Sequence, residues 1–111
     1  IPFMAMPDAI KALLLLEAAP NASLSQLSYN VGSFSPSAAD IHHFVMGAFP
    51  QAQISYAVHP QRQTIVDSWP EDVDDSPARK DWGWQPDYDM DRSFNEYLIP
   101  AIRTRYASHP C

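Results

Sequence analysis

The chain has few cysteines and few basic side chains. Its single cysteine, Cys111, cannot form a disulfide within the chain, so a reducing, cytoplasmic setting is expected. Only seven Lys and Arg face thirteen Asp and Glu, and the formal net charge is −6. This balance argues against a nucleic-acid partner, because nucleic acids are held mainly by cations placed on their phosphates.

Long apolar runs and targeting signals are also absent. No run approaches the ~18–20 apolar residues that cross a membrane, so no membrane partner is expected. The start of the chain lacks the basic segment and the cleavage site of a secretory signal. The sequence begins at Ile1, without an initiator methionine, and opens directly into an apolar stretch. We therefore expect a portion of a longer polypeptide.

Glycine is scarce, and this excludes one kind of cofactor site. A dinucleotide site needs a glycine-rich turn that opens a helix, whereas the three glycines here, Gly32, Gly47 and Gly83, are isolated. None of the five tyrosines is followed four residues later by the lysine that would lower its pKa in a short-chain dehydrogenase. No cofactor-binding or catalytic residue is therefore expected within this chain.

The residues that could ligate a metal lack the necessary spacing. Asp87, Asp89 and Asp91 match the first three acidic positions of an EF-hand loop, but Arg92 stands where the loop requires glycine. His42 and His43 are adjacent on a predicted helix and project about 100° apart, so they cannot face one ion. Helix capping and solvated helix faces explain these side chains better, and no metal is expected.

Eleven prolines divide the chain into short elements. Three helices are predicted at residues 7–19, from Ser35 or Ser37 to 49, and from Ser76 to Gly83. A last helix is predicted after Asp89 or Asp91, with a kink or a split at Pro100. Alternating apolar residues predict strands at 27–31 and 53–58. The fold class expected is α/β, with too few strands for a complete sheet.

The first predicted helix is apolar on nearly all sides. Ile10 and the run from Leu13 to Leu16 surround its axis, and Pro7 and Asp8 suit its first turn. Such a helix is expected to be buried on more than one side. The chain has little material to cover it, which indicates a missing partner.

The stretch 62–86 holds all three tryptophans and much of the negative charge. Trp69 precedes Pro70 and is expected to be extended at a strand end, either as a pocket wall or as a core residue. Arg62 could face an anionic substrate group or pair with nearby carboxylates. Trp82 and Trp84 flank a helix-ending glycine, so we expect them to clamp a short helix onto the fold.

Several short motifs resemble one enzyme family: YNVG at 29–32, DSWP at 67–70, DDS at 74–76 and DWGWQP at 81–86. They resemble the C-terminal part of the extended short-chain dehydrogenases, within them most closely the NAD-dependent L-threonine 3-dehydrogenases related to sugar-nucleotide epimerases. This resemblance implies a Rossmann domain, absent here, that binds NAD and supplies the catalytic Tyr/Lys pair. It also implies three parts in this chain: 1–33 as the trailing helix and strand of the Rossmann-type core, 34–106 as a substrate-binding C-terminal lobe, and 107–111 as a frayed tail.

By this resemblance, the substrate contacts come from the segment 62–70, and we assign them to Arg62, Asp67, Ser68 and Trp69. The implied substrate is L-threonine or a similar small molecule, oxidised to 2-amino-3-ketobutyrate with NAD bound by the missing half. The intact enzyme is expected to be a homo-oligomer, cytoplasmic or, in a eukaryote, mitochondrial.

Two alternatives remain open from the sequence. One is the lobe of an NDP-sugar epimerase or dehydratase, although a nucleotide diphosphate would require more than the single permanent cation near the site. The other is a binding module without enzymatic activity, which would have to fold cooperatively by itself.

Overall fold

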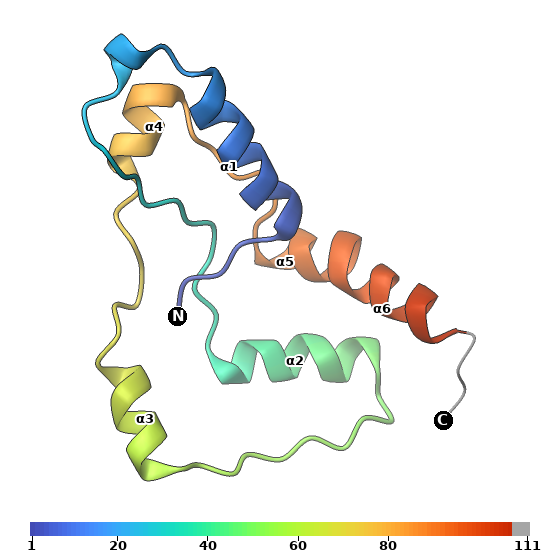
Figure 1. Cartoon of the computed structure of the whole chain (residues 1–111). Coiled ribbons are helices and arrows are strands. Elements are labelled where there is room, and N and C mark those ends of the chain that lie inside the picture. Colours follow the sequence, from blue (N-terminus) through green and yellow to red (C-terminus); the bar gives the residue numbers. More distant parts are fainter. Residues whose placement is uncertain (108–111) are drawn as a thin grey trace.

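The computed structural model describes residues 1–107 and is built from helices joined by long connections (Figure 1). In chain order, the helical elements are α1 (Met6–Ala18), η1 (Asn21–Ser23), α2 (Ala38–Ala48), α3 (Pro60–Asp67), α4 (Ser76–Trp82), α5 (Met90–Arg92), η2 (Ser93–Leu98) and α6 (Ile99–Tyr106). The predicted tail 107–111 lies outside the described residues, except for Ala107. No helix in the described part is long and apolar enough to cross a membrane.

The strands predicted at 27–31 and 53–58 are wrong for residues 1–107. The described backbone contains only one isolated antiparallel bridge, in which Phe3 and Phe34 exchange N–H···O bonds of 2.8 and 3.3 Å. A strand needs a neighbour for its N–H and C=O groups, and neither predicted segment has one here. The α/β class is therefore not confirmed for this chain by itself.

Helix α1 is anchored to the segment that follows α4. The carboxylate of Asp8, which is 1% exposed, accepts hydrogen bonds from the backbone N–H groups of Asp87 and Tyr88, both at 2.9 Å. One turn further along, Lys11 Nζ donates to the Gln85 carbonyl at 2.8 Å and lies 2.7 Å from the Asp87 carboxylate. The predicted start of this helix, with Pro7 in its first turn, is confirmed.

A small core joins α1 to α4. Ala12, Ala78 and Trp84 are buried together, and Trp84 Nε1 donates to the Gly32 carbonyl at 3.3 Å. Trp82 packs beside this core and meets the ring of Tyr29 edge-on at 5.8 Å between centroids. The two tryptophans therefore hold α4 against the fold.

Local signals set the ends of α2 and α4 as expected. Ser37 begins α2 with a capping box to Asp40, and these hydrogen bonds lower the pKa of the Asp40 carboxyl. Gly83 ends α4 with φ 71°, a left-handed conformation that an L side chain adopts only with strain. Of the two predicted caps for α2, Ser37 is therefore the one used.

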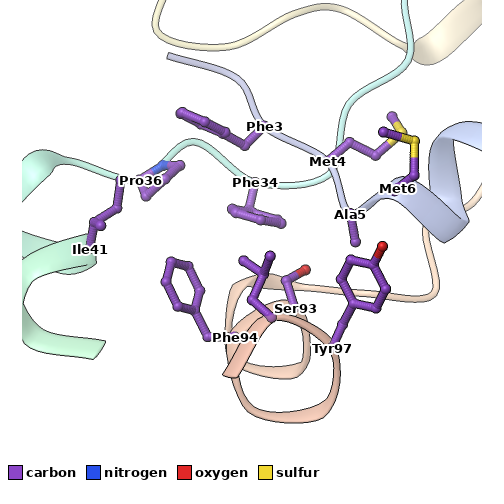
Figure 2. A pocket seen from close by; sticks show the side chains of 11 residues that line it. Phe3, Met4, Ala5, Met6, Phe34, Pro36, Ile41, Ser93, Phe94 and Tyr97 are labelled. Atoms are coloured by element: carbon purple, nitrogen blue, oxygen red, sulfur yellow. The ribbon is translucent and has the colours of Figure 1, made fainter. Parts of the chain in front are cut away.

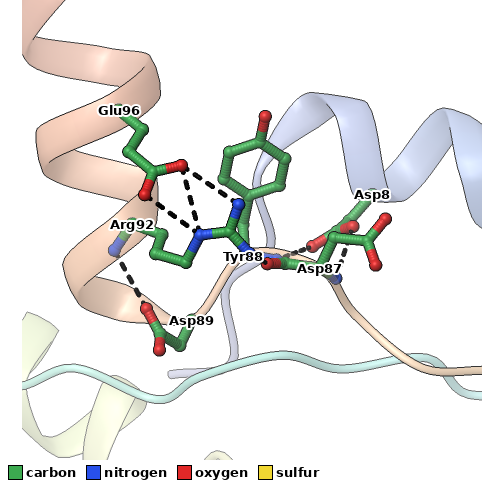
Figure 3. Close-up of polar contacts among 6 residues, drawn as sticks. All are labelled: Asp8, Asp87, Tyr88, Asp89, Arg92 and Glu96. Carbon is green, nitrogen blue, oxygen red and sulfur yellow. Dashed lines mark hydrogen bonds and ion pairs between the residues drawn. The ribbon is translucent and has the colours of Figure 1, made fainter.

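The last helical run continues through Pro100 without a break. Asp89 begins it by accepting from the Arg92 N–H at 2.9 Å, and Arg92 also pairs with Glu96 at 3.1 Å (Figure 3). The segment just before Pro100, η2, has π-helical turns instead of a sharp kink. Proline has no N–H to donate to a carbonyl of the preceding turn, and a π-helical turn tolerates the missing hydrogen bond. The helix therefore widens before Pro100 instead of splitting there.

The molecule is open for its length. Its radius of gyration is 17.4 Å, against about 13 Å for a compact domain of this size. On α1, Ile10, Leu13 and Leu14 are 52%, 70% and 63% exposed, so the burial expected on several sides is not found within the described chain. Helix α3 lies at the end of the molecule opposite α1 and α4 (Figure 1).

Candidate functional site

Helix α3 carries or adjoins all four predicted substrate residues. It begins at Pro60, whose fixed φ suits the first helical position, and the His59 side chain accepts from the Arg62 N–H at 3.4 Å. Gln63 donates to Asp67 one turn later at 2.6 Å. The sequence pattern does not predict this helix, although Pro60 after a possible cap at His59 is a usable signal for its start.

A shallow hollow of about 290 Å³ surrounds Arg62. Its lining comprises Tyr56, Ala57, Val58, His59, Arg62, Gln63 and Val66. Among residues 1–107 the ion pairs are Lys11–Asp87, Arg79–Asp75 and Arg92–Glu96, so Arg62 does not pair with the nearby carboxylates. Its guanidinium keeps five donors for a planar anion such as a carboxylate.

The other three predicted residues lie at the opposite end of α3, outside that hollow. Asp67 accepts the bond from Gln63, and Ser68 Oγ donates to the Ile65 carbonyl at 2.6 Å. Trp69 donates its backbone N–H to Val66 at 3.0 Å, and its side chain is 53% exposed. Trp69 therefore follows a helix and not the predicted strand, and it is not a core residue in the described chain.

Helical spacing places only two of these residues on a common face. Arg62 and Val66, four positions apart, lie on one face of α3, whereas Trp69 lies beyond Asp67, the last residue of the helix. The side chains of Asp67 and Ser68 form hydrogen bonds to residues of α3 itself. Helix α3 therefore offers a cation and an aliphatic residue on one face, and the exposed Trp69 indole follows its C-terminal end.

The acidic residues of the loop after Trp69 form hydrogen bonds with the first residues of α4. Asp74 accepts from the Ser76 N–H at 3.0 Å, and its hydrogen bonds to Ser76 lower the pKa of the Asp74 carboxyl. Arg79 forms a two-pronged pair with Asp75, with contacts of 2.7 and 2.8 Å. These acids support the helix start, and no cluster of three potential ligands that could hold a metal occurs within residues 1–107.

Comparisons with known proteins find L-threonine dehydrogenases and an epimerase/dehydratase as relatives. The chain is 42% identical over 90 residues to the mitochondrial L-threonine 3-dehydrogenase of Bos taurus, and 35% identical over 103 residues to an uncharacterised epimerase/dehydratase of Staphylococcus haemolyticus. Its fold matches the L-threonine dehydrogenase of Phytophthora infestans with a TM-score of 0.80 at 39% identity, over 93% of this chain. The resemblance to extended short-chain dehydrogenases of the L-threonine dehydrogenase type is confirmed.

The chain matches only part of the length of each relative. The chain spans 24% of the Bos taurus enzyme, 32% of the staphylococcal protein and 33% of the Phytophthora infestans structure. The GalE-like L-threonine dehydrogenase of Cupriavidus necator gives the same picture, with a TM-score of 0.80 and 32% of its length covered. No family model matches the chain. The similarity therefore concerns a quarter to a third of such an enzyme, consistent with its C-terminal portion.

Proposed function

We propose that this chain is the substrate-side lobe of an NAD-dependent oxidoreductase that resembles L-threonine 3-dehydrogenase. The observation that carries the proposal is the fold match at 39% identity, which extends over nearly the whole chain but only a third of the enzyme. The chain has neither a glycine-rich turn nor a Tyr/Lys pair, so NAD and the catalytic pair would come from another part of the enzyme. By itself the chain would be inactive.

The partner of this lobe would be the cofactor-binding domain, and α1 is the surface best suited to receive it. Leu13 and Leu14 are largely exposed, and a neighbouring apolar cavity of about 300 Å³ runs from α1 to Trp82. The Trp82 indole N–H is buried there without a partner in the described chain. Covering this face would remove apolar surface from water, which is the main driving force of association.

Arg62 on α3 and Trp69 just after this helix would supply the substrate contacts. The Arg62 guanidinium would bind the carboxylate of L-threonine through paired N–H···O bonds, and the exposed Trp69 indole would close over the aliphatic part. The reaction would transfer a hydride from the hydroxyl-bearing carbon to NAD and the hydroxyl proton to a base on the other domain, giving 2-amino-3-ketobutyrate. The intact enzyme would be a homo-oligomer, cytoplasmic or mitochondrial.

A chimera tests this proposal directly. The segment of the Phytophthora infestans enzyme that matches this chain is replaced by the chain, and NADH formation from L-threonine is measured. We expect the chimera to turn over and the isolated chain, mixed with NAD and L-threonine, to give no NADH. A folded but inactive chimera, or turnover by the isolated chain, would contradict the proposal.

Substitutions in the chimera then test the individual residues. Arg62→Ala should raise KM for L-threonine about 10- to 100-fold, the value of a charge-assisted hydrogen-bonded pair. Arg105→Ala removes an equal charge from the exposed end of α6 and should leave KM unchanged. If both variants behave alike, Arg62 does not contact the substrate.

A second candidate, the lobe of an epimerase or dehydratase acting on an NDP-sugar, is favoured by the staphylococcal relative, which aligns with 92% of this chain. A diphosphate would require more cations than Arg62 and His59 provide in the hollow. Titrating the chimera with UDP-sugars and with L-threonine separates the candidates, because saturable binding of the sugar nucleotide alone would select the second.

A further inference from the structure

An apolar cavity of about 380 Å³ is lined entirely by residues outside α3 (Figure 2). Its walls come from three segments distant in sequence: the residues before α1, the stretch 34–41, and η2. Phe3 and Phe34 stack at 6.5 Å on one side, and Phe94 faces them from the last helical run. None of its lining residues lines the Arg62 hollow, so the cavity is separate from the site proposed above.

One polar group in this cavity lacks a partner. Ser93 is 1% exposed, and its Oγ forms no hydrogen bond within the described chain. A helical serine commonly donates to the carbonyl four residues earlier, but here the Asp89 carbonyl accepts only the Ser93 backbone N–H, at 2.9 Å. Figure 2 shows the Ser93 side chain facing the space between Phe34 and Tyr97. A buried hydroxyl without a partner destabilises a fold, so it requires an explanation.

The lining restricts what could occupy the cavity. It contains no charged side chain, so a zwitterion such as L-threonine or the phosphates of a nucleotide would lose hydration without compensation. Aromatic rings and the flexible thioethers of Met4 and Met6 favour an aromatic or branched body. The volume lies within the range of small-molecule pockets, well above the ~150 Å³ that holds benzene.

We propose that this cavity binds a small neutral aromatic molecule whose single acceptor oxygen takes the hydrogen bond of the Ser93 hydroxyl. The hydroxyl supplies orientation, and the surrounding rings supply the buried apolar area. The π-helical segment η2 carries Ser93, Phe94 and Tyr97, and all three line the cavity.

Acetophenone is a suitable probe, tested on the whole natural polypeptide that carries this chain. Amide chemical shifts are followed during titration with acetophenone, with the isosteric hydrocarbon α-methylstyrene, and with benzoate. We expect saturable shifts at Ala5, Phe34 and Ser93 with acetophenone, about fivefold weaker binding of α-methylstyrene, and none of benzoate. Absence of saturable shifts at these residues overturns the proposal, as does equal binding of the ketone and the hydrocarbon.

Two variants complete the test. Ser93→Ala should remove the preference for the ketone over the hydrocarbon while leaving the unfolding midpoint unchanged or higher, because it deletes an unsatisfied hydroxyl. Ser55→Ala, in the exposed segment before α3, should change neither property. If Ser93→Ala lowers stability and keeps the ketone preference, the serine is only structural and the proposal is wrong. Loss of threonine oxidation in the chimera would not affect this outcome, because the two sites share no residue.

Discussion

Two regions of this molecule contrast in how they hold their side chains. The anchored corner, in which α1 and α4 meet the segment 84–88, buries Asp8, Ala78 and Trp84. The α3 arm, residues 53–72, is exposed at every position. Trp84 is 2% exposed and Trp69 is 53% exposed, although both come from the same motif-rich stretch.

This contrast indicates that the corner stabilises the fold and that the arm is available for binding. In the corner, long-range hydrogen bonds join residues about 50 to 80 positions apart, as Trp84 to Gly32 and Tyr88 to Asp8 show. In the arm, the side-chain hydrogen bonds of residues 59–68 stay within α3 and its caps, and the one long-range bond is a 3.5 Å contact from Ser35 Oγ to Asp72. Changes in the corner should therefore affect unfolding, whereas changes in the arm should affect substrate binding and leave the fold intact.

The largest effect is expected from Trp84→Ala. Removing this indole opens a cavity in the small core and deletes the bond to Gly32, which should lower the free energy of unfolding by about 3–5 kcal/mol. Trp69→Ala is the matched change in the arm and should stay within about 0.5 kcal/mol. Urea unfolding followed by far-ultraviolet circular dichroism measures both. Equal losses in the two variants would refute the contrast between the regions.

The next effect is expected from Asp8→Asn. The amide can accept only through its one oxygen, so one of the two N–H groups from Asp87 and Tyr88 loses its acceptor. The free energy of unfolding should fall by about 1–3 kcal/mol. Asp67→Asn, in the arm, keeps an acceptor for Gln63 and should be nearly neutral in the same urea experiment. A neutral result for Asp8→Asn would show that the anchor of α1 lies elsewhere.

Replacing each of two glycines by alanine should change the free energy of unfolding by a smaller amount, and in opposite directions. Gly83→Ala forces a side chain into φ 71° and should cost about 1–2 kcal/mol. Gly47→Ala lies within α2, where a Cβ meets no atom within 4 Å, and should stabilise by about 0.5–1 kcal/mol through helix propensity. Thermal melting of both variants checks the signs. A stabilising Gly83→Ala would mean that α4 does not end in the left-handed conformation.

The smallest effect is a pH dependence in the corner. Hydrogen bonds from Ser25 and Tyr29 hold the pKa of the Asp81 carboxyl below its ordinary 3.8. A carboxyl whose pKa is lower in the folded chain stabilises it above the ordinary value, and loses that contribution as the pH falls through the folded value.

Amide hydrogen exchange at Ser25, compared between neutral and acidic pH, measures this effect. Exchange, corrected for its intrinsic pH dependence, should accelerate in acid in the natural chain, and Asp81→Asn should remove the acceleration. An unchanged acid response in Asp81→Asn would assign the effect to another carboxyl.

The extent of sequence prediction differs between elements for a physical reason. Helix ends that depend on hydrogen bonds within a few residues are predicted best: Gly83 ends α4 as expected, and Ser37, one of the two predicted caps, begins α2. The strands at 27–31 and 53–58 failed because alternation of apolar residues shows that a segment can form a strand, not that a neighbour is present. Helix α3 is not predicted because most of its residues are polar, and helix prediction from periodicity depends on a repeating pattern of apolar residues.

The sequence predicts which residues belong to the candidate site but not how they are arranged in space. DSWP and DWGWQP indicate a resemblance to L-threonine dehydrogenases, and the comparisons confirm that resemblance. Only the structure separates Arg62, with its hollow, from Asp67 and Ser68, whose side chains are bonded within α3. The substrate role of these residues stays a prediction until the chimera is measured.

The sequence by itself determined the first turn of α1, the end of α4 at Gly83 and the resemblance to the family, because each depends on residues that are neighbours along the chain. Only the tertiary structure decided which tryptophan is buried, which carboxylate anchors α1, and that Phe3, Phe34 and Ser93 line one cavity. Those outcomes depend on contacts between segments tens of residues apart, and burial depends on what else occupies the same space.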